Sequence, residues 1–264
     1  MLNETVMRLS IFLGTLIIFS LLEAVFPRKK RTQKRSKRWL THIGFTIIDT
    51  VAVRLLGPIV ALSTASWAMT KNIGLFNLTD WPLWFEVILA FIILDFAIYL
   101  QHIATHKIPL LWRLHKVHHS DRDLDASSAL RFHPIEIVLS MIYKCALVLL
   151  IGPAVIAVLI FEICLNASAI FNHANLILPQ WLDRALRPFI VTPDMHRVHH
   201  SIIVSETDSN FGFNFSIWDR VFKTYQAQPK AGHTEMTIGL SEHQTNAPTN
   251  LIWSLKLPFA KLRD

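Results

Sequence analysis

The sequence contains little cysteine, and this limits the kinds of site that it can build. Only two of its 264 residues are cysteine, Cys145 and Cys164, and both stand inside apolar runs. Two cysteines exclude a disulfide framework and a zinc site made of thiolates. We interpret both as small side chains of a buried core.

Motifs of several common enzyme classes are also missing. The sequence has no glycine-rich motif for a flavin or a dinucleotide, no haem domain and no His-Glu-x-x-His pattern of zinc hydrolases. It contains no low-complexity segment, and its one internal similarity is between two His-x-x-His-His elements. Electrons for any redox reaction would therefore have to come from another protein.

Apolar residues, in contrast, are abundant and are gathered in long runs. They make up 52% of the chain, which is too many for an ordinary soluble domain. The apolar runs cover residues 6–26, 43–69, 83–101, 135–151 and 154–171. A bilayer core of about 30 Å needs about 20 helical residues. The sequence therefore predicts an all-α integral membrane protein with four to five hydrophobic helices and a cytoplasmic, histidine-rich helical cap.

Two Gly-Pro pairs interrupt these runs. Gly57-Pro58 breaks the second run, and Gly152-Pro153 separates the last two, because a proline ends or kinks a helix. We expect the last two runs to form a helical hairpin. The sequence leaves open whether this hairpin crosses the membrane fully or only dips into it.

The first apolar run has two interpretations, a signal peptide or a retained membrane anchor. A signal peptide begins with basic residues and ends at a small-residue cleavage site. Here the basic residues follow the run instead, between Arg28 and Arg38. This order favours a retained anchor.

The same basic segment predicts the topology. It holds eight basic residues and no acid, and since the net charge is +7, the rest of the chain carries −1. A basic run can bind nucleic acid, but after a hydrophobic run it is typical of a cytoplasmic loop. If the following runs cross the membrane in turn, starting from this cytoplasmic loop, every histidine cluster lies on the cytoplasmic face.

The spacing of the histidines is the most informative feature of the sequence. Ten of the 13 lie between residues 102 and 200. His102 and His106 form an i, i+4 pair on one helix face, and two elements each place one histidine beside two others three and four residues later. These elements are His115-Lys-Val-His118-His119 and His196-Arg-Val-His199-His200. Imidazole is a common ligand of transition metals, so the pattern predicts metal binding.

The number of histidines suits two metal ions better than one. Eight ligands are too many for one tetrahedral zinc ion, and no carboxylate stands within the clusters. Two alternatives stay open, a membrane zinc-dependent lipid hydrolase and a non-catalytic metal-binding or transport protein. A transport protein would place its ligands at mid-bilayer depth, whereas these clusters follow the ends of apolar runs.

The chain resembles the fatty acid hydroxylase and sterol desaturase superfamily of integral-membrane di-iron oxygenases. The resemblance rests on the histidine elements and on four stretches around them, covering about residues 35–226. These stretches are Leu111–Ser120, Arg131–Pro134, Thr192–Ser201 and Trp218–Tyr225. Lys223 departs from the family, which usually has glycine there, and Asn210-Phe-Gly stands in place of Asn-Tyr-Gly. Neither change touches an expected ligand.

The resemblance implies a set of cofactors, partners and ligands. It implies two iron ions, dioxygen as co-substrate, a lipid substrate, and a cytochrome b-type protein or a ferredoxin with its reductase as electron donor. Phe171–Asn175 matches a family element and adds His173 as a ninth ligand. Some relatives have a tenth histidine where this chain has Ala169, so water, Asn172 or His133 could take that place. The resemblance does not choose between hydroxylation and desaturation.

A few further residues are candidates for supporting the metal ligands. Asp95 and Tyr99 precede His102 by seven and three residues on one helix face, and an acid inside a membrane helix is usually functional. Asp95 could orient His102 or His106, or it could make a structural hydrogen bond. His133 could be a ligand, a supporting residue or a helix cap. We expect His42, His233 and His243 not to bind metal.

We divide the chain into three parts. Residues 1–34 form the N-terminal membrane helix and the basic segment, residues 35–226 form the membrane-embedded catalytic domain, and residues 227–264 form a polar tail. The tail contains Pro229, Gly232 and Pro248, and we expect it to be loose. The sequence predicts a multi-pass membrane enzyme without a role in nucleic-acid binding.

Overall fold

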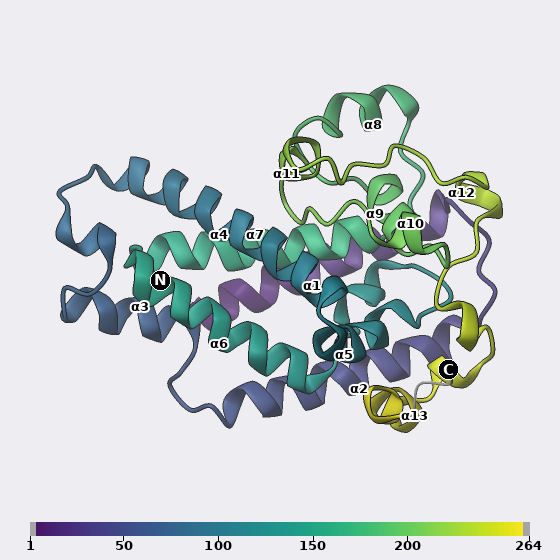
Figure 1. The fold of residues 1–264 in the computed structure, drawn as a ribbon, viewed down its shortest axis with the longest axis horizontal. Helices are drawn as coiled ribbons and strands as arrows, with labels where there is room; N and C mark the ends of the chain where they lie inside the picture. The colour runs from purple at the N-terminus through teal and green to yellow at the C-terminus, as the bar shows by residue number, and fades with distance from the viewer. Residues whose placement is uncertain (1–3, 261–264) are drawn as a thin grey trace.

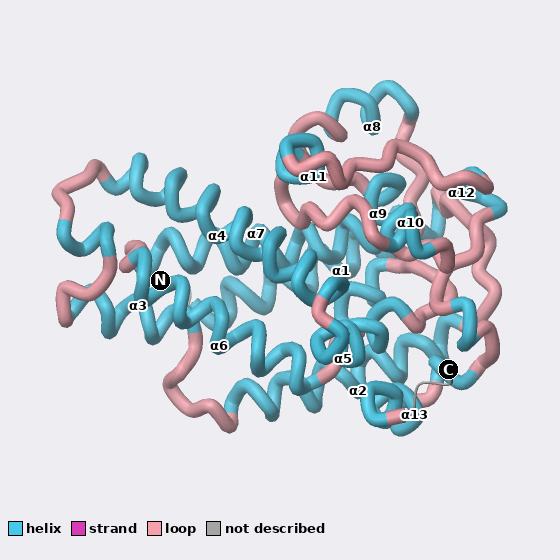
Figure 2. Tube along the Cα trace, in the orientation of Figure 1, coloured by secondary structure: helices cyan, strands magenta, loops and turns pink. Residues whose placement is uncertain are grey.

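The fold is entirely helical over residues 4–260, which are the residues that the structure, a computed structural model, describes. Seven helices come first, and Figure 1 shows most of them running roughly along the long axis: α1 (Glu4–Val25), α2 (Arg35–Arg54), α3 (Ala61–Thr70), α4 (Leu83–Lys107), α5 (Pro109–His119), α6 (Pro134–Ile151) and α7 (Val155–His173). Figure 2 shows no strand in this part of the chain, which contains only three isolated bridges. The prediction of an all-α fold is confirmed.

Shorter helices gather at one end of the long bundle and form, with α5, a cap (Figure 1). They are α8 (Gln180–Leu186), α9 (Pro193–His199), α10 (Val204–Thr207), α11 (Ile217–Val221), α12 (Gly232–Glu235) and α13 (Leu251–Lys256). The 3-10 helices are η1 (Leu75–Leu78), η2 (Ala126–Leu130), η3 (Ser241–His243), η4 (Ala247–Thr249) and η5 (Leu257–Phe259).

Four of the described helices, α1, α4, α6 and α7, are long and apolar enough to cross a membrane. The chain is therefore a multi-pass membrane protein, as predicted. The hairpin helices α6 and α7 have 18 and 19 residues. At 1.5 Å per residue each extends about 27–29 Å, which is close to the thickness of the bilayer core.

The second predicted run is not one helix. It is divided into α2 and α3 by a turn in which Gly57 has a φ of 64°. Helix α2 also begins at Arg35, inside the basic segment, and carries Asp49 and Arg54. In Figure 1, α2 begins at the cap and α3 lies at the opposite end, so the two follow each other along the bundle.

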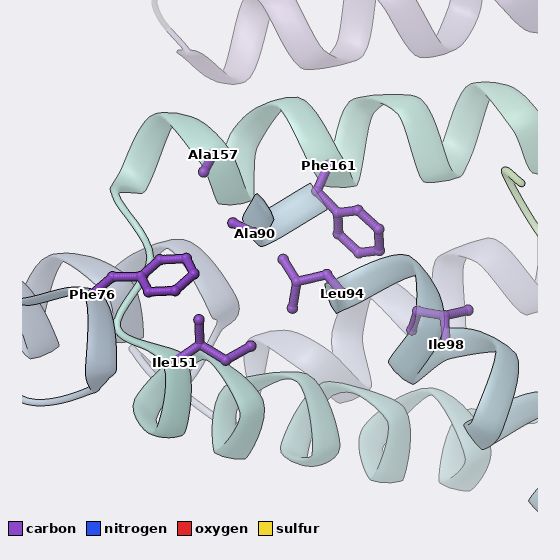
Figure 3. Packing of buried hydrophobic residues seen from close by; sticks show 7 residues of the cluster. All are labelled: Phe76, Ala90, Leu94, Ile98, Ile151, Ala157 and Phe161. Atoms are coloured by element: carbon purple, nitrogen blue, oxygen red, sulfur yellow. The ribbon is translucent and has the colours of Figure 1, made fainter. Parts of the chain in front are cut away.

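The bundle core lies where α4 meets α6 and α7. Figure 3 shows Leu94 of α4 near Phe161 of α7, and Ile151 of α6 near Phe76 of η1; all four belong to one buried cluster. Two glycines permit a close backbone approach at the end of this core. A Cβ on Gly74 would lie 2.3 Å from the backbone nitrogen of Gly152, and both glycines have a positive φ. The turn after α3 therefore packs directly on the α6–α7 connection.

The basic segment is attached to the protein through its arginines. They pair with carboxylates of α1, of α9 and of the segment after α5: Arg28 with Asp194, Arg31 and Arg35 with Glu23, and Arg38 with Asp121 and Asp125. Three lysines of the same segment, Lys30, Lys34 and Lys37, are exposed. The segment is thus a structural clamp as well as a charged loop.

The C-terminal part is packed and not loose, which corrects our expectation. Met236 and Ile238 are each 2% exposed. The Thr41 hydroxyl of α2 donates to the carbonyl of Thr249, and Arg131 donates to the Ser254 hydroxyl. Residues 227–260 therefore cover α2 and the loop before α6. The three-part division of the chain stays a prediction.

Candidate metal centre

Four helices bring nine histidines together at the cap end of the bundle. They are His102 and His106 at the end of α4, His115, His118 and His119 in α5, His173 at the end of α7, and His196, His199 and His200 in and just after α9. Prolines start α5 and α9, where the first turn tolerates a missing N–H. These short helices therefore begin at fixed points and turn their histidines toward α4 and α7.

The nine histidines form two groups. One group consists of His102, His106, His115, His119 and His199, and the other of His118, His173, His196 and His200. In each group the candidate ligand atoms all lie within 4.8 Å of one another. That spacing is compatible with one metal ion per group.

The two His-x-x-His-His elements contribute to both groups. In the first element, His115 and His119 belong to the five-histidine group and His118 to the four-histidine group. In the second element the arrangement is reversed, with His199 in the five-histidine group. Because adjacent helical residues point in different directions, one element can supply two neighbouring ions.

Ring nitrogens in the four-histidine group fit a metal ion. The Nδ1 atoms of His118 and His173 lie 3.1 and 2.7 Å from the carbonyl oxygens of Arg131 and Ala169. A carbonyl only accepts, so each Nδ1 carries the proton and each Nε2 presents a lone pair. Those two Nε2 atoms are only 3.0 Å apart. Facing lone pairs at this distance repel each other unless a cation lies between them.

In the five-histidine group, too, ring nitrogens are oriented so that they can bind a metal ion. Backbone carbonyls of Phe211 and Ser209 accept from the Nδ1 atoms of His102 and His199, each at 2.8 Å. The buried Nε2 atoms of His106, His115, His119 and His199 have no hydrogen-bond partner among the described residues. Buried polar atoms without a partner are costly. A metal ion would satisfy all four.

Burial keeps five of the cap histidines uncharged. Loss of water lowers the pKa of His199 to about 3. Burial, followed by neighbouring histidines, holds the pKa of His118, His119, His196 and His200 well below the usual value. Neutral imidazole is the form that binds metals. The site is therefore ready for cations near neutral pH.

Glu136, which the sequence marked only as an acid within an apolar run, supports a metal ligand in the structure. Its Oε1 lies 2.6 Å from Nδ1 of His115, and its side chain is buried in the first turn of α6. A carboxylate in this position fixes the tautomer and the ring orientation of a metal-binding histidine. An acid at the start of an apolar run was the available signal.

Asp95 does not contact the histidines, so of its two predicted roles the structure shows the structural hydrogen bond. Its carboxylate accepts from the backbone and side chain of Asn214, from the backbone of Phe215 and from the indole of Trp218. Asp95 thus attaches the loop before α11 to α4. That loop continues back to Phe211, whose carbonyl orients His102.

Tyr99 also binds this part of the cap and not a histidine. Its hydroxyl lies 2.9 Å from the Thr224 hydroxyl, which donates to Asp219. Asp219 further accepts from the backbone nitrogens of Phe211 and Gly212. Tyr99 is therefore connected to the metal site only indirectly, through Thr224, Asp219 and the loop that carries Phe211.

His133 is a helix cap. Its Nδ1 accepts from the backbone nitrogen of Ile135, which leaves the proton on Nε2, and that nitrogen lies 3.3 Å from the carbonyl of Leu255. Both ring nitrogens are used, so His133 has no lone pair for a metal. Of the three roles predicted for His133, a ligand, a supporting residue and a helix cap, the structure shows the helix cap.

Asn172 and Ala169 lie beside the four-histidine group. The Asn172 amide nitrogen donates to the carbonyl of Phe213 at 2.8 Å, and its buried Oδ1 has no partner among the described residues. Ala169 lies one helical turn before His173 and accepts from its ring. Asn172 therefore keeps a free acceptor beside this group, and its role as a tenth ligand stays a prediction.

The remaining three histidines lie outside both groups. His42 contacts the Ser127 hydroxyl and Asp121, and His243 packs against the Trp253 ring. His233 is buried 3.7 Å from Asp194. Their placement agrees with our expectation that they do not take part in the cluster.

A cavity of about 210 Å³ reaches the histidines from the membrane side. His102 and His115 form part of its wall, with Phe132 and Phe213 beside them. Leu165 and Ala169 of α7 line the rest with residues of α4 and α6. The candidate metal centre therefore opens toward a mainly apolar space inside the bundle.

Comparison with known proteins gives one family. The sequence profile described as fatty acid hydroxylase matches residues 87–224, which contain all nine histidines. No solved structure matches the chain with statistical significance.

Three relatives illustrate the similarity. Ornithine lipid hydroxylase OlsE of Rhizobium tropici is 27% identical over 236 residues, which is 86% of this chain and 70% of that protein. Human alkylglycerol monooxygenase is 30% identical over 200 residues, 73% of this chain and 40% of that protein. Cholesterol 25-hydroxylase of Rattus norvegicus is 24% identical over 145 residues, 54% of this chain and 48% of that protein. The matches thus span less than half of the last two.

Proposed function

Because the chain belongs to the fatty acid hydroxylase family, we propose that it hydroxylates a C–H bond of a membrane lipid with dioxygen and two iron ions. The observation that carries this proposal is the pair of interleaved histidine groups beside an apolar cavity. The relatives named above are a hydroxylase of ornithine lipid, a monooxygenase of alkylglycerol and a hydroxylase of cholesterol. Their names favour hydroxylation over desaturation.

The nine histidines would hold the two irons, five on one ion and four on the other. When bound, iron supplies the activation of dioxygen that protein side chains cannot provide. The choice of iron over zinc rests on the all-histidine ligand set in this family. Backbone carbonyls and Glu136 orient the rings, so the ligand positions are preorganised before any ion binds.

The cavity walls would position the lipid and exclude water. Apolar side chains such as Phe132, Leu165 and Phe213 favour a hydrocarbon chain over a polar substrate. His102 and His115 lie on the same cavity, so a bound chain would pass next to the five-histidine group. This arrangement exposes one C–H bond to the centre and keeps the remainder in an apolar space.

Hydroxylation needs an electron donor. Inserting one oxygen atom into a C–H bond and reducing the other to water consumes two electrons and two protons. We propose that a cytochrome b-type protein or a ferredoxin with its reductase supplies the electrons. We further propose that the site faces the cytoplasm, because the basic segment lies at the same end of the bundle.

Isotope incorporation tests the reaction. The purified protein should contain iron, and with an electron donor and labelled dioxygen it should transfer one labelled oxygen to a lipid from a membrane extract. Incorporation of oxygen from labelled water, or turnover without dioxygen, would support a hydrolase and contradict the proposal. A double bond without labelled oxygen in the product would make the protein a desaturase.

A further inference from the structure

A second cavity lies on the bilayer side of the first. It measures about 220 Å³ and is lined by residues of α4, α5 and α6. Its outer residues Leu100 and Leu139 are 43% and 42% exposed and belong to membrane-spanning helices. This outer cavity therefore opens to the hydrocarbon region, while the inner cavity reaches His102 and His115.

Three polar side chains separate the two cavities. Gln101, Thr105 and Glu136 line both of them. Two of the three are fixed, because Thr105 donates to the His102 carbonyl at 2.7 Å and Glu136 lies 2.6 Å from the His115 ring. Gln101 contacts the Ser140 hydroxyl across the gap at 3.4 Å, near the limit of a hydrogen bond. Gln101 is thus the least restrained part of the partition.

We propose that the hydrocarbon chain of a lipid enters sideways from the bilayer between α4 and α6, and that Gln101 is the gate. The occupant follows from the surroundings, since the outer opening faces lipid tails and its wall includes Leu111, Leu114 and Leu139. Together the two cavities fall within the roughly 300–1,000 Å³ of ordinary ligand pockets. Rotation of the Gln101 side chain would join them into one passage to the histidines.

This inference rests on the proposed function, because the passage would bring the lipid substrate to the metal centre. Entry of a lipid chain can nevertheless be tested without catalysis. The probe is a phosphatidylcholine with a photoreactive diazirine on one acyl chain, in liposomes that contain the purified protein. After irradiation, mass spectrometry locates the adducts. Labelling of Leu165 or Phe132, which line the inner cavity, reports that a chain has entered.

Two variants should change this labelling in opposite directions. Ala104 lines the outer cavity, and Ala104→Trp places a large ring in it, so inner labelling should fall by about tenfold. Gln101→Ala removes the gate and should raise inner labelling several-fold. Ile142→Trp is the matched control, because Ile142 of α6 is 49% exposed but lines neither cavity. Its labelling should equal that of the wild type.

The outcomes separate the passage from the reaction. Inner labelling that is absent in the wild type, or unchanged in both Ala104→Trp and Gln101→Ala, would overturn the lateral entry. If the labelling follows the prediction but no labelled oxygen enters a lipid, the proposed function fails and the passage stands. If Ala104→Trp hydroxylates lipid as fast as the wild type, the passage fails and the function stands.

Discussion

At the scale of single residues, the carbonyl that accepts from the outer nitrogen of a histidine decides which nitrogen can face a metal, and four of the nine rings have such a partner. Carbonyls of Arg131, Ala169, Ser209 and Phe211 hold the protons of four rings on Nδ1. The Nε2 lone pairs then point inward by default. The polypeptide backbone therefore prepares much of the ligand field, and ordinary residue types can stand at those positions.

Removing one histidine from either group should reduce the bound iron. His118→Ala affects the four-histidine group and His199→Ala the five-histidine group. Each change removes a ligand and leaves a buried gap, so iron per protein should fall by about half or more. Metal analysis of purified variants measures this, with His243→Ala as control because His243 lies outside both groups. Two irons in both ligand variants would refute the assignment.

Glu136 provides a finer test of ring orientation. Glu136→Ala leaves His115 without its partner and should weaken metal affinity by about 10–100-fold, as is usual for such supporting carboxylates. Glu136→Gln keeps an oxygen that accepts from Nδ1 and should restore most of the affinity. Metal titration of the protein after iron removal gives both values. Equally weakened affinity in the two variants would mean that the charge of Glu136, and not its orientation of the His115 ring, sets the metal affinity.

Sequence spacing predicted the histidines but not the atoms that orient them. Helical periodicity alone places His102 beside His106 and His115 beside His119. A backbone carbonyl such as that of Phe211 has no residue type to identify it. The sequence could not choose between the two predicted roles of Asp95 for a related reason, since the loop that binds it comes from more than 110 residues later in the chain.

At the scale of elements, the buried Arg38 joins α2 to the loop after α5. It contacts Asp121 and Asp125 and donates to the carbonyl of Asp123, and its side chain is 1% exposed. This ion pair holds the pKa of Asp121 well below its usual value, through charge and hydrogen bonding that outweigh burial. The loop connects His119 to η2, so α2 supports the metal centre from outside it.

Arg38→Met should therefore destabilise the protein strongly. The substitution keeps part of the volume but deprives the buried carboxylates of Asp121 and Asp125 of their nearest cation, a loss worth roughly 3–5 kcal/mol. Thermal unfolding in detergent should show a clearly lower midpoint. Lys37→Met is the control, because Lys37 is the exposed neighbour and should leave the midpoint nearly unchanged. Similar midpoints for both variants would contradict the clamp.

The sequence predicted which segments are helical better than it predicted their ends. The apolar runs at 83–101 and 154–171 correspond to α4 and α7, but each helix continues to its histidines, at Lys107 and His173. Hydrophobicity fades where a helix leaves the bilayer, although the backbone stays helical. The first turns of α2 were missed for the same reason, because they are polar. Contacts with the cap stabilise this part of the helix in place of contacts with lipid.

At the scale of the whole molecule, the order of the helices places every histidine at one end. Helices α1, α4 and α7 arrive at the cap, whereas α2 and α6 leave it (Figure 1). The three segments that carry the histidines therefore meet there, although they are spread over about a hundred residues of the sequence. These segments are residues 102–119, His173 and residues 196–200. The number and order of the hydrophobic runs were enough to predict this arrangement, because a run long enough to span the bilayer carries the chain from one end to the other.

The exposed lysines at the two ends of the bundle predict which side of the membrane the cap faces. Exposed Lys30, Lys34 and Lys37 flank the end of α1, and positively charged loops are retained in the cytoplasm. Lys71, which is also exposed, follows α3 at the other end of the bundle. We therefore expect Lys34 inside the cell and Lys71 outside it.

Cysteine labelling on intact cells decides this point. In a background with Cys145 and Cys164 replaced by alanine, a membrane-impermeant maleimide should label Lys71→Cys directly and Lys34→Cys only after lysis. Both lysines are exposed, so a difference in reactivity before lysis reports the side of the membrane and not burial. The reverse pattern would place the histidines outside the cell, where neither a cytochrome b-type protein nor a ferredoxin of the cytoplasm could supply their electrons.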